Sequence, residues 1–409
     1  MTTQTLPKNW ARSTVAKAAT VIMGQSPDSQ FVNEDEVGIP FLQGNAEFTD
    51  KYPSPAHWVT KPTKLSNKDD ILISVRAPVG EMNIADKEYC IGRGLAAIRF
   101  SEVDNRFGWY AIAYHKDQLS KLAQGSTFTA ISSKDFSIFE IIHPIDSVEQ
   151  RAIADILSTL DEAITQSESL VRKYQSIKQG LMSDLLMRGV DENGELRPEN
   201  KTRLQKSPFG LFPMEWEVVL MDKVAIRGSG HTPSRSHPEY WNGGIKWVSL
   251  ADSSKLDKVF ISETDKNISE LGIQNSSAVK HPAGTVIISR DAGIGKSAII
   301  TDEMAVSQHF IAWTCGKRLT NLFLYYWLQY RKRDFESIAF GSTIQTIGLQ
   351  YFRDLKVVLP PLEEQKSIAE ILFTAEKMID EEAANLGKLN YLKQGLMQDL
   401  LSGQVRVKV

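Results

Sequence analysis

One nine-residue segment occurs twice in this chain, and this repetition constrains the fold more than any other feature. The sequence KQGLMSDLL begins at Lys178 and KQGLMQDLL begins at Lys393, so the copies differ only at Ser183 and Gln398. Each copy ends a long segment in which apolar residues recur with helical spacing. Such a repeat, far apart in one chain, indicates a duplicated architecture.

Self-alignment extends the repeat over most of the chain. The segments that begin at Val148 and Glu363 align without a gap, and each follows a strand-like run that ends in proline, FEIIHP and KVVLPP. Upstream, the sequence GQSP at Gly24 matches GHTP at Gly230. The sequence therefore predicts two copies of one unit, each a globular domain followed by a long helix.

Each long segment has apolar residues at the alternating spacing of four and three that is typical of a coiled coil. This seam runs from Ile153 to Leu185 and from Ile368 to Leu400. Two copies related by a two-fold axis perpendicular to the helices pack antiparallel, and helices of about 40 residues are ~60 Å long. The predicted fold class is α+β, with two tandem globular domains separated by two long helices that pack as an antiparallel coiled coil, a pseudo-two-fold internal repeat.

The alignment divides the chain into five segments. We predict a first globular domain at 1–146, a central helix at 147–188, a polar linker at 189–212, a second globular domain at 213–361, and a C-terminal helix with a tail at 362–409. Trp10 and Trp216 lie at matched positions near the start of each domain and are predicted to anchor its core.

Composition restricts the class of protein. No apolar run approaches the roughly 18 residues that a membrane-spanning helix needs, and the N-terminal sequence MTTQTLPKNW lacks the pattern of a signal peptide. Cys90 and Cys315 lie far apart, which favours a reducing compartment and no structural zinc site. We expect a soluble cytoplasmic protein with no membrane partner. The net charge of −3 means that DNA binding would depend on local basic patches.

The sequence shows no catalytic centre. Gly295-Lys-Ser resembles the end of a phosphate-binding loop, but Arg290 occupies the position where that motif requires its first glycine. Methyltransferase motifs are missing, and the seven histidines show no metal-binding spacing. We therefore predict no catalytic residue, no metal ligand and no cofactor bound by this chain.

The duplicated plan resembles the specificity subunit of type I restriction–modification systems. The resemblance rests on PPLEEQ at 360–365 and on long helices that end in KQGLM-DLL, and it covers the whole chain. It implies that each globular domain reads one half of a split DNA target, while the helices set the half-site spacing and dock methyltransferase subunits. The implied partners are double-stranded DNA, two methyltransferase subunits and, in a complete complex, restriction subunits. S-adenosylmethionine, ATP and Mg²⁺ are then expected on those partners.

DNA-contacting residues are expected where polar residues differ between otherwise matched loops, because different half-sites require different base contacts. Arginine pairs with guanine and glutamine with adenine, which favours Arg93 and its counterpart Gln308. Ordinary surface variation would produce the same differences, and the two Gly-Ser-Thr turns fit a plain helix end as well as a phosphate contact. The predicted residues are Gln43, Asn45, Arg76, Arg93, Ser126, Thr127, Lys246, Arg290, Lys296, Gln308, Ser342 and Thr343.

A second apolar stripe flanks the seam on each long helix. One buried face per helix accounts for the seam but not for this stripe, which indicates a further partner. The residues predicted to contact methyltransferase subunits are Ile156, Leu170, Ile177, Ile371, Met378 and Leu392.

Two other functions compete with this interpretation. A stand-alone DNA-modifying enzyme with two recognition domains would need the methyltransferase motifs that the sequence lacks. A coiled-coil scaffold without a DNA role would not need two large domains that have diverged from each other.

Overall fold

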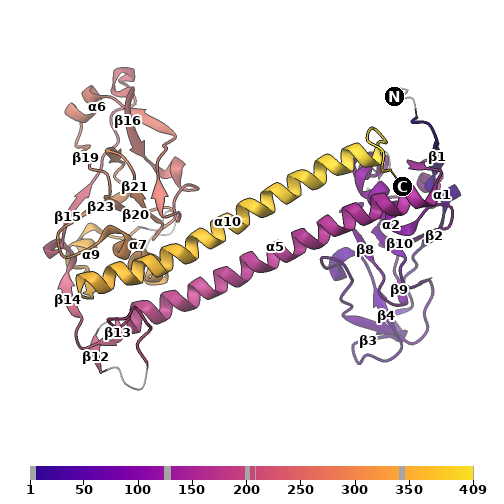
Figure 1. Cartoon of the computed structure of the whole chain (residues 1–409), viewed down its shortest axis with the longest axis horizontal. Coiled ribbons are helices and arrows are strands. Elements are labelled where there is room, and N and C mark those ends of the chain that lie inside the picture. Colours follow the sequence, from indigo (N-terminus) through magenta and orange to yellow (C-terminus); the bar gives the residue numbers. More distant parts are fainter. Residues whose placement is uncertain (1–5, 124–129, 199–202, 208, 340–345, 409) are drawn as a thin grey trace. The chain divides into compact units, whose positions relative to one another are not determined.

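The chain folds into two compact units, each built from one globular domain and parts of both long helices (Figure 1). The computed structural model describes residues 6–123, 130–198, 203–207, 209–339 and 346–408. The first unit contains residues 1–169 and 383–409, and the second contains residues 170–382. Helices α5 (Ser147–Arg188) and α10 (Leu362–Leu401) each contribute one end to each unit. No helix among the described residues is long and apolar enough to cross a membrane.

The first domain contains a four-stranded antiparallel sheet with the order β2-β10-β7-β8 and a five-stranded mixed sheet with the order β3-β5-β4-β9-β6. A separate pair, β1 and β11, joins the start of the domain to the strand that precedes α5. The elements are β1 (Trp10–Thr14), α1 (Val15–Ala18), β2 (Ala19–Met23), η1 (Ser29–Phe31), β3 (Val32–Asn33), β4 (Ile39–Leu42), η2 (Asn45–Glu47), β5 (His57–Val59), β6 (Leu65–Ser66), β7 (Ile71–Ser74), β8 (Met82–Ile84), β9 (Tyr89–Ile91), β10 (Leu95–Phe100), α2 (Asn105–Tyr114), α3 (Lys116–Ala123), α4 (Ser133–Phe136) and β11 (Glu140–Pro144).

The second domain repeats this topology except at two sheet edges, because β17 is an added strand and β3 of the first domain has no counterpart. Its sheets have the orders β15-β23-β20-β21-β17 and β18-β16-β22-β19, and the pair β14-β24 corresponds to β1-β11. The elements are β14 (Glu217–Leu220), η3 (Met221–Lys223), β15 (Ala225–Ser229), η4 (Pro238–Tyr240), β16 (Trp241–Val248), η5 (Leu250–Asp252), β17 (Phe260–Ile261), β18 (Lys266–Ile268), α6 (Glu270–Gln274), β19 (Lys280–His281), β20 (Val286–Ser289), β21 (Ser297–Ile300), β22 (Met304–Val306), β23 (Phe310–Cys315), α7 (Asn321–Tyr330), α8 (Lys332–Ile338), α9 (Leu349–Asp354) and β24 (Lys356–Leu359). The predicted duplication of an α+β unit is confirmed.

The linker predicted at 189–212 contains regular structure that the sequence analysis did not predict. Strands β12 (Leu204–Ser207) and β13 (Gly210–Pro213) form a hairpin, with Leu204 opposite Pro213. The side chain of Phe212 is buried in the core of the second unit. Burial of this aromatic ring explains why a mostly polar segment is ordered against the domain.

The two long helices run antiparallel, as predicted. In the first unit, Ile153 and Leu157 near the start of α5 share a core with Leu400 and Leu401 at the end of α10. In the second unit the relation is reversed, because the last turns of α5 share a core with the first turns of α10. Every position of both predicted seams is buried or partly buried, so the spacing of four and three correctly identified the packed face.

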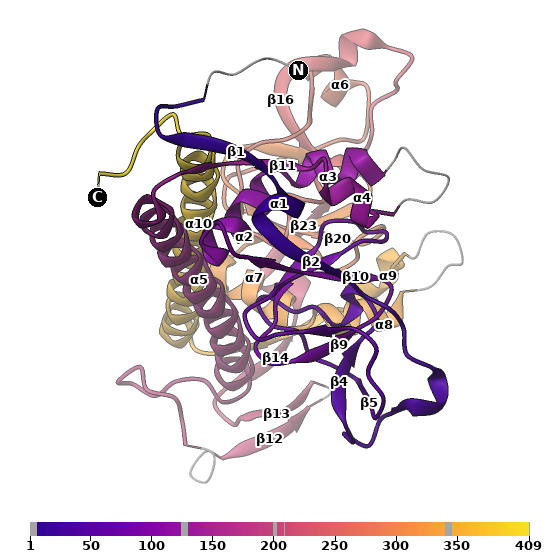
Figure 2. The same ribbon diagram turned by 90° about the vertical axis from the view of Figure 1, so that its right-hand side faces the viewer.

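Helix α2 connects the first domain to α5, as Figure 2 shows with this domain facing the viewer. The helix packs on β10 and β11. From its other side, the hydroxyl of Tyr110 donates to Asp161 of α5 (2.7 Å), and Arg106 pairs with Asp155 (2.7 Å). These contacts fix the direction in which α5 leaves its domain.

One glutamine at a matched position attaches each long helix to its own domain in the same way. Gln150 accepts a hydrogen bond from the N–H of Asp104, the N-cap of α2, and donates to the carbonyl of Pro144 (both 2.7 Å). Gln365 accepts from the N–H of Thr320, the N-cap of α7 (3.0 Å), and donates to the carbonyl two residues before α10 (2.8 Å). In both helices this glutamine thus satisfies backbone groups that would otherwise be buried without partners.

A glycine in the left-handed conformation follows each long helix, Gly189 (φ +70°) directly after α5 and Gly403 (φ +73°) two residues after the end of α10. A β-carbon at Gly189 would lie 2.5 Å from the ring of Trp216, and one at Gly403 would lie 3.2 Å from the ring of Trp10. Glycine is therefore required by both conformation and space. The two tryptophans are buried, as predicted, and each packs against the helix that ends in its unit.

A buried glutamate at the start of each long helix binds an arginine that follows the end of the other. Glu149 forms two hydrogen bonds of 2.6 Å with Arg406. Glu364 accepts hydrogen bonds from Arg197 (3.0 Å) and from Trp216 Nε1 (3.1 Å). Burial raises the pKa of Glu364, although its arginine and tryptophan donors favour the ionised form. These paired contacts repeat the internal symmetry at the level of single side chains.

Candidate nucleic-acid interface

Four loops come together in the second domain, where they follow β15, β16, β20 and β22. The N–H of His231 donates to the last carbonyl of β22 (3.1 Å), and the N–H of Ser307 donates to the last carbonyl of β16 (2.9 Å). The N–H of Arg290 donates to the carbonyl of His309 (2.9 Å). Residues that are far apart in sequence therefore share one surface at the ends of these strands.

The first domain builds the same framework with the same bonds. Gln25 donates to the last carbonyl of β9 (2.9 Å), Gly92 to the last carbonyl of β4 (2.7 Å), and Val75 to the carbonyl of Gly94 (2.9 Å). Each bond corresponds to one of the three bonds in the second domain under the alignment of the two repeats. The loops are thus equivalent in structure, while the side chains at their tips differ.

At the surface of the first domain, the framework brings together the loops that carry Gln43 and Arg93. A β-carbon on Gly94 would lie 2.6 Å from the carbonyl oxygen of Gln43, so a glycine is needed for this approach. The side chains of Gln43, Arg76 and Arg93 are exposed, and Asn45 is half-buried at the start of η2. Three of the predicted DNA-contacting residues therefore project from adjoining loops into solvent.

In the second domain, the counterparts form a hydrogen-bonded chain. Thr232 Oγ1 donates to Gln308 Oε1 (2.6 Å), Gln308 Nε2 lies 3.3 Å from His309 Nε2, and His309 Nδ1 lies 2.5 Å from Asp291. The hydroxyl of Thr346 also donates to Asp291. Gln308 was predicted from sequence, whereas the partners that hold it were not.

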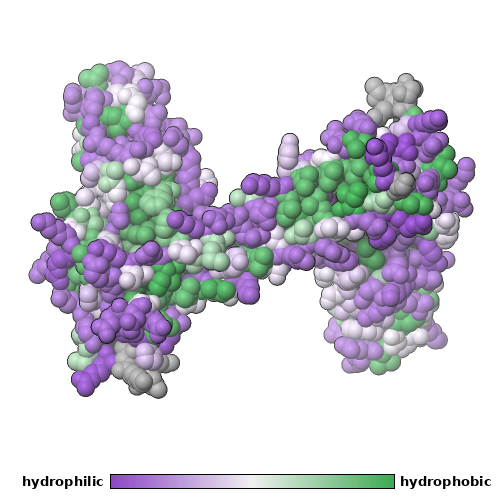
Figure 3. Space-filling view, in the orientation of Figure 1, coloured by the Kyte–Doolittle hydropathy of each residue, from purple (hydrophilic) through white to green (hydrophobic). Residues whose placement is uncertain are grey.

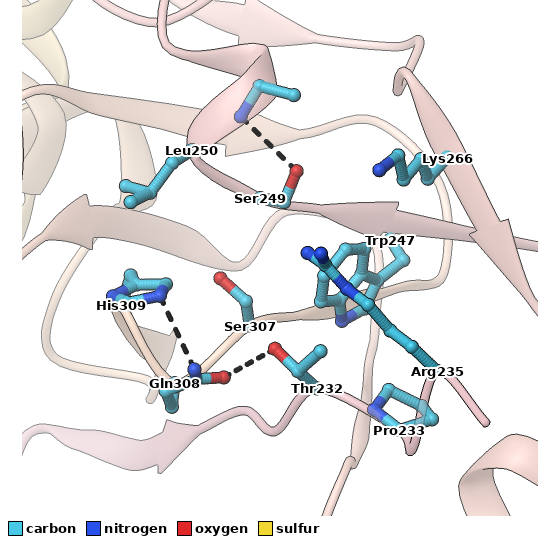
Figure 4. A pocket seen from close by; sticks show the side chains of 11 residues that line it. Thr232, Pro233, Arg235, Trp247, Ser249, Leu250, Lys266, Ser307, Gln308 and His309 are labelled. Atoms are coloured by element: carbon cyan, nitrogen blue, oxygen red, sulfur yellow. Dashed lines mark hydrogen bonds between the residues drawn. The ribbon is translucent and has the colours of Figure 1, made fainter.

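This chain forms one wall of a pocket of about 450 Å³ (Figure 4). The indole of Trp247 and the side chains of Leu250 and Pro233 supply apolar lining, and Arg235 and Lys266 point toward the same space. Both cations are exposed, and neither forms an ion pair with a carboxylate of the described residues. The pocket therefore places two exposed cations beside a largely buried indole, and exposed cations of this kind can contact an anionic group such as a phosphate.

The other cations predicted in this domain have protein partners. Lys246 donates to Asp302 (2.8 Å) and lies 3.4 Å from Glu263, and the hydrogen bond with Asp302 raises the pKa of the Lys246 ammonium. Arg290 donates to the carbonyl of Ile347 (2.9 Å), and Lys296 donates to Ser253 (3.0 Å). These three residues are placed to hold loops, so DNA contacts by them remain predictions without support from the geometry.

Four further predicted residues, Ser126, Thr127, Ser342 and Thr343, lie outside the described residues. The residues that were not among the predicted DNA contacts are Thr232, Arg235, Trp247, Lys266, Asp291 and His309. A partial signal was available, because Thr232 lies in the matched GHTP segment and His309 follows Gln308 directly. Among the described residues, no cluster of three or more His, Cys, Asp or Glu side chains is arranged to hold a metal ion.

The residues of the second stripe on the long helices are mostly exposed. Their exposed fractions are 38% for Ile156, 38% for Leu170, 45% for Ile177, 43% for Met378 and 50% for Leu392. Ile371 differs, because it is partly covered by the core of the second domain. Figure 3 shows apolar side chains at the surface along the long helices. These side chains are therefore accessible to solvent, and their contact with a partner stays a prediction.

Two domains with equivalent loop frameworks and different loop tips, each joined to antiparallel helices, define a protein built by internal duplication. Two segments, residues 7–178 and 213–391, match the family model described as the type I restriction modification DNA specificity domain. The chain therefore belongs to the family of type I restriction–modification specificity subunits, and the resemblance inferred from the sequence is confirmed.

Similar proteins agree with this family. The chain is 24% identical over 416 residues to the type I restriction enzyme MjaVIII specificity subunit of Methanocaldococcus jannaschii, covering 98% of this chain and 94% of that protein. It is 41% identical over 186 residues to the putative type I restriction enzyme MjaX specificity subunit of the same organism, but that match spans only 44% of this chain and 43% of the relative.

Among solved structures, the fold is similar to that of the type I restriction–modification S subunit from M. genitalium. The TM-score is 0.62 at 17% identity, over 97% of this chain and 98% of the other. This likeness covers both domains and both long helices, and it supports the fold.

Proposed function

We propose that each globular domain reads one half of a bipartite DNA target. The observation that carries this proposal is the pair of equivalent loop frameworks. The backbone bonds that hold the loops are the same in both domains, while the loop tips expose Gln43 and Arg93 in one domain and Gln308 in the other. Shared scaffolds with different polar tips suit two readers of different sequences, because base edges are distinguished by side-chain donors and acceptors.

We further propose that the antiparallel helices set the spacing between the half-sites and dock methyltransferase subunits. Ion pairs and apolar seams hold both ends of the helix pair, so the pair can act as a rigid spacer. The exposed stripe at Ile156, Leu170 and Ile177 offers a docking surface of the kind that amphipathic partners bury.

In this proposal, the chain contributes recognition and no chemistry. Its partners are double-stranded DNA, two methyltransferase subunits and restriction subunits. S-adenosylmethionine, ATP and Mg²⁺ belong to those partners. The chain acts on DNA inside the cell, in the cytoplasm.

Sequencing of methylated bases in a host that expresses this chain with methyltransferase subunits tests the proposal. We expect one split motif with two defined halves and an undefined gap. Alanine substitution at Arg93 should alter one half, and substitution at Gln308 should alter the other. A continuous motif, or single variants that change both halves together, would contradict the proposal that each domain reads its own half-site.

A further inference from the structure

The amide of Gln308 is held at both of its polar atoms by neighbours in the same domain. Its Oε1 accepts from Thr232 Oγ1 at 2.6 Å, and its Nε2 lies 3.3 Å from His309 Nε2. The side chain is nevertheless exposed and lines the pocket beside Trp247. An exposed glutamine ordinarily keeps several rotamers, and ordering it costs entropy on binding. Here the domain has ordered it in advance.

The direction of each hydrogen bond follows from Asp291. As a carboxylate, Asp291 accepts from Thr346 and from His309 Nδ1, so the ring hydrogen lies on Nδ1. In the tautomer that carries its only ring hydrogen on Nδ1, Nε2 is an acceptor, and the NH₂ group of Gln308 faces it at 3.3 Å. The Gln308 oxygen consequently faces the Thr232 hydroxyl. This amide orientation gives both polar atoms of Gln308 a partner, as Figure 4 shows for Thr232 and His309.

The held amide keeps one N–H and one oxygen lone pair free for a ligand, because a primary amide has two donors and two acceptor positions. A planar group that offers one donor beside one acceptor matches the N7 acceptor and N6 donor of adenine in the major groove. Guanine presents two acceptors at the same edge and would leave the amide oxygen facing a carbonyl oxygen.

A second observation in the same pocket points to a ligand. Ser307 is 1% exposed, and its Oγ has no hydrogen-bond partner within the part of the chain that the structure describes. Its hydroxyl points into the pocket next to Gln308 (Figure 4). A buried hydroxyl without a partner is costly, and a polar group of an incoming base pair would satisfy it.

We infer that the second domain reads an adenine in its DNA half-site through Gln308, with Thr232 and His309 as the positioning residues that fix the amide. The inference rests on the proposed function, because it assumes that this domain contacts DNA. The first domain cannot make the same contact. At the positions of Gln308 and His309 it carries Arg93 and Gly94, and Arg76 stands at the position of Asp291.

The test uses the complete methyltransferase complex and DNA libraries in which every base of both half-sites is randomised. Wild-type protein is compared with Gln308→Ala, Thr232→Val and Thr232→Ser. For Gln308→Ala we expect the preference for one A·T pair to fall roughly 10- to 100-fold, with all other positions unchanged. Thr232→Val should reduce the preference for the same A·T pair, but by less than Gln308→Ala does. Thr232→Ser should keep the wild-type preference, because it keeps the hydroxyl.

The outcomes separate this inference from the proposed function. If wild-type complex shows no split motif, the proposed function fails. If the wild-type motif is split and Gln308→Ala is equally selective at every base, or relaxes a G·C pair, the adenine inference is overturned and the proposed function stands. Should Gln308→Ala fail to assemble, Thr232→Val decides, because unchanged selectivity in that variant would also overturn the inference.

Discussion

The ammonium group of Lys393 lies 2.5 Å from a carboxylate oxygen of Asp161, which joins α10 to α5 in the first unit. In the second unit, Lys178 forms the matching ion pair with Glu376. The two lysines open the repeated nonapeptides and interrupt the apolar seam of each helix at the same place. Polar residues at such positions fix the register of paired helices, which explains why both copies keep a lysine there.

The first prediction concerns this register. Reversal of charge in Lys393→Glu places two carboxylates together and should lower the free energy of unfolding by about 1 kcal/mol, since the pair is partly solvated. The double variant Lys393→Glu with Asp161→Lys should recover most of the loss. Thermal unfolding measures both effects. The exposed residue Lys388 on the same helix provides the control, and Lys388→Glu should change the stability little. Equal losses in both single variants would show that the ion pair does not set the register.

The second prediction concerns the docking stripe. Simultaneous change of Ile156, Leu170 and Ile177 to Asp should abolish copurification with methyltransferase subunits, because charges would replace exposed apolar side chains. The three residues are 38–45% exposed in the free chain, so circular dichroism should show a folded protein.

A matched control places three aspartates on the opposite side of the same helix. The residues Thr165, Ser176 and Gln179 are exposed there and belong to neither the seam nor the stripe. Their change to Asp adds the same charge and should leave copurification intact. If both triple variants lose the partner, net charge rather than the stripe is responsible.

The sequence predicted the fold and the site to different extents, for a physical reason. Helical seams and repeated segments are local patterns, so the ends of α5 and α10 and the equivalence of the loops followed directly. The network at Gln308 was not predictable in the same way. Asp291 and His309 are brought together by the pairing of β20 with β23, and Thr346 by the backbone bond from Ile347 to Arg290. The first domain offers no matching residues to reveal them.

The linker shows a similar limit. Polar composition and turn residues indicated an irregular segment, yet a hairpin forms there because Phe212 reaches a core that the linker itself does not contain. Lys246 and Lys296 likewise looked available in the sequence, but carboxylates and carbonyls elsewhere in the domain bind them.

The third prediction concerns Arg93, which projects between Gly92 and Gly94 in the first domain. Arg93→Ala should cost ~1–3 kcal/mol at one base pair of the first domain's half-site if the guanidinium contacts a base edge. The other half-site should keep its full selectivity. Lys17→Ala is the control, because this exposed residue precedes β2 at the end of the strand away from the loops. Methylation of randomised half-sites measures the base selectivity of both variants. If Arg93→Ala keeps the wild-type selectivity at every base pair, Arg93 does not read the sequence.

The fourth prediction concerns Arg235 and Lys266 at the pocket. Alanine at either position should weaken DNA binding about equally for all sequences and reduce the slope of log K against log salt by about 1, as expected for a phosphate contact. Binding measured at several salt concentrations tests this slope. Lys223→Ala, at the opposite end of β15, should leave the slope unchanged. A change in base preference without a change in slope would instead indicate base contacts.

The last prediction is that helix length sets the gap between the half-sites. One heptad inserted after Val171 and one after Leu386 lie between the two interhelical ion pairs on each helix, so both pairs and the seam stay in phase. The insertions lengthen each helix by roughly 10 Å, which corresponds to about three base pairs of DNA.

Three base pairs also rotate one half-site relative to the other by roughly 100°, so weaker binding is expected unless the DNA twists. Sequencing of methylated sites should show both half-sites unchanged and a longer gap. An insertion in only one helix shifts the seam by seven residues against its partner, separates one of the ion pairs and should abolish methylation. If the double-insertion variant still methylates sites with the original gap, the helices do not determine the spacing.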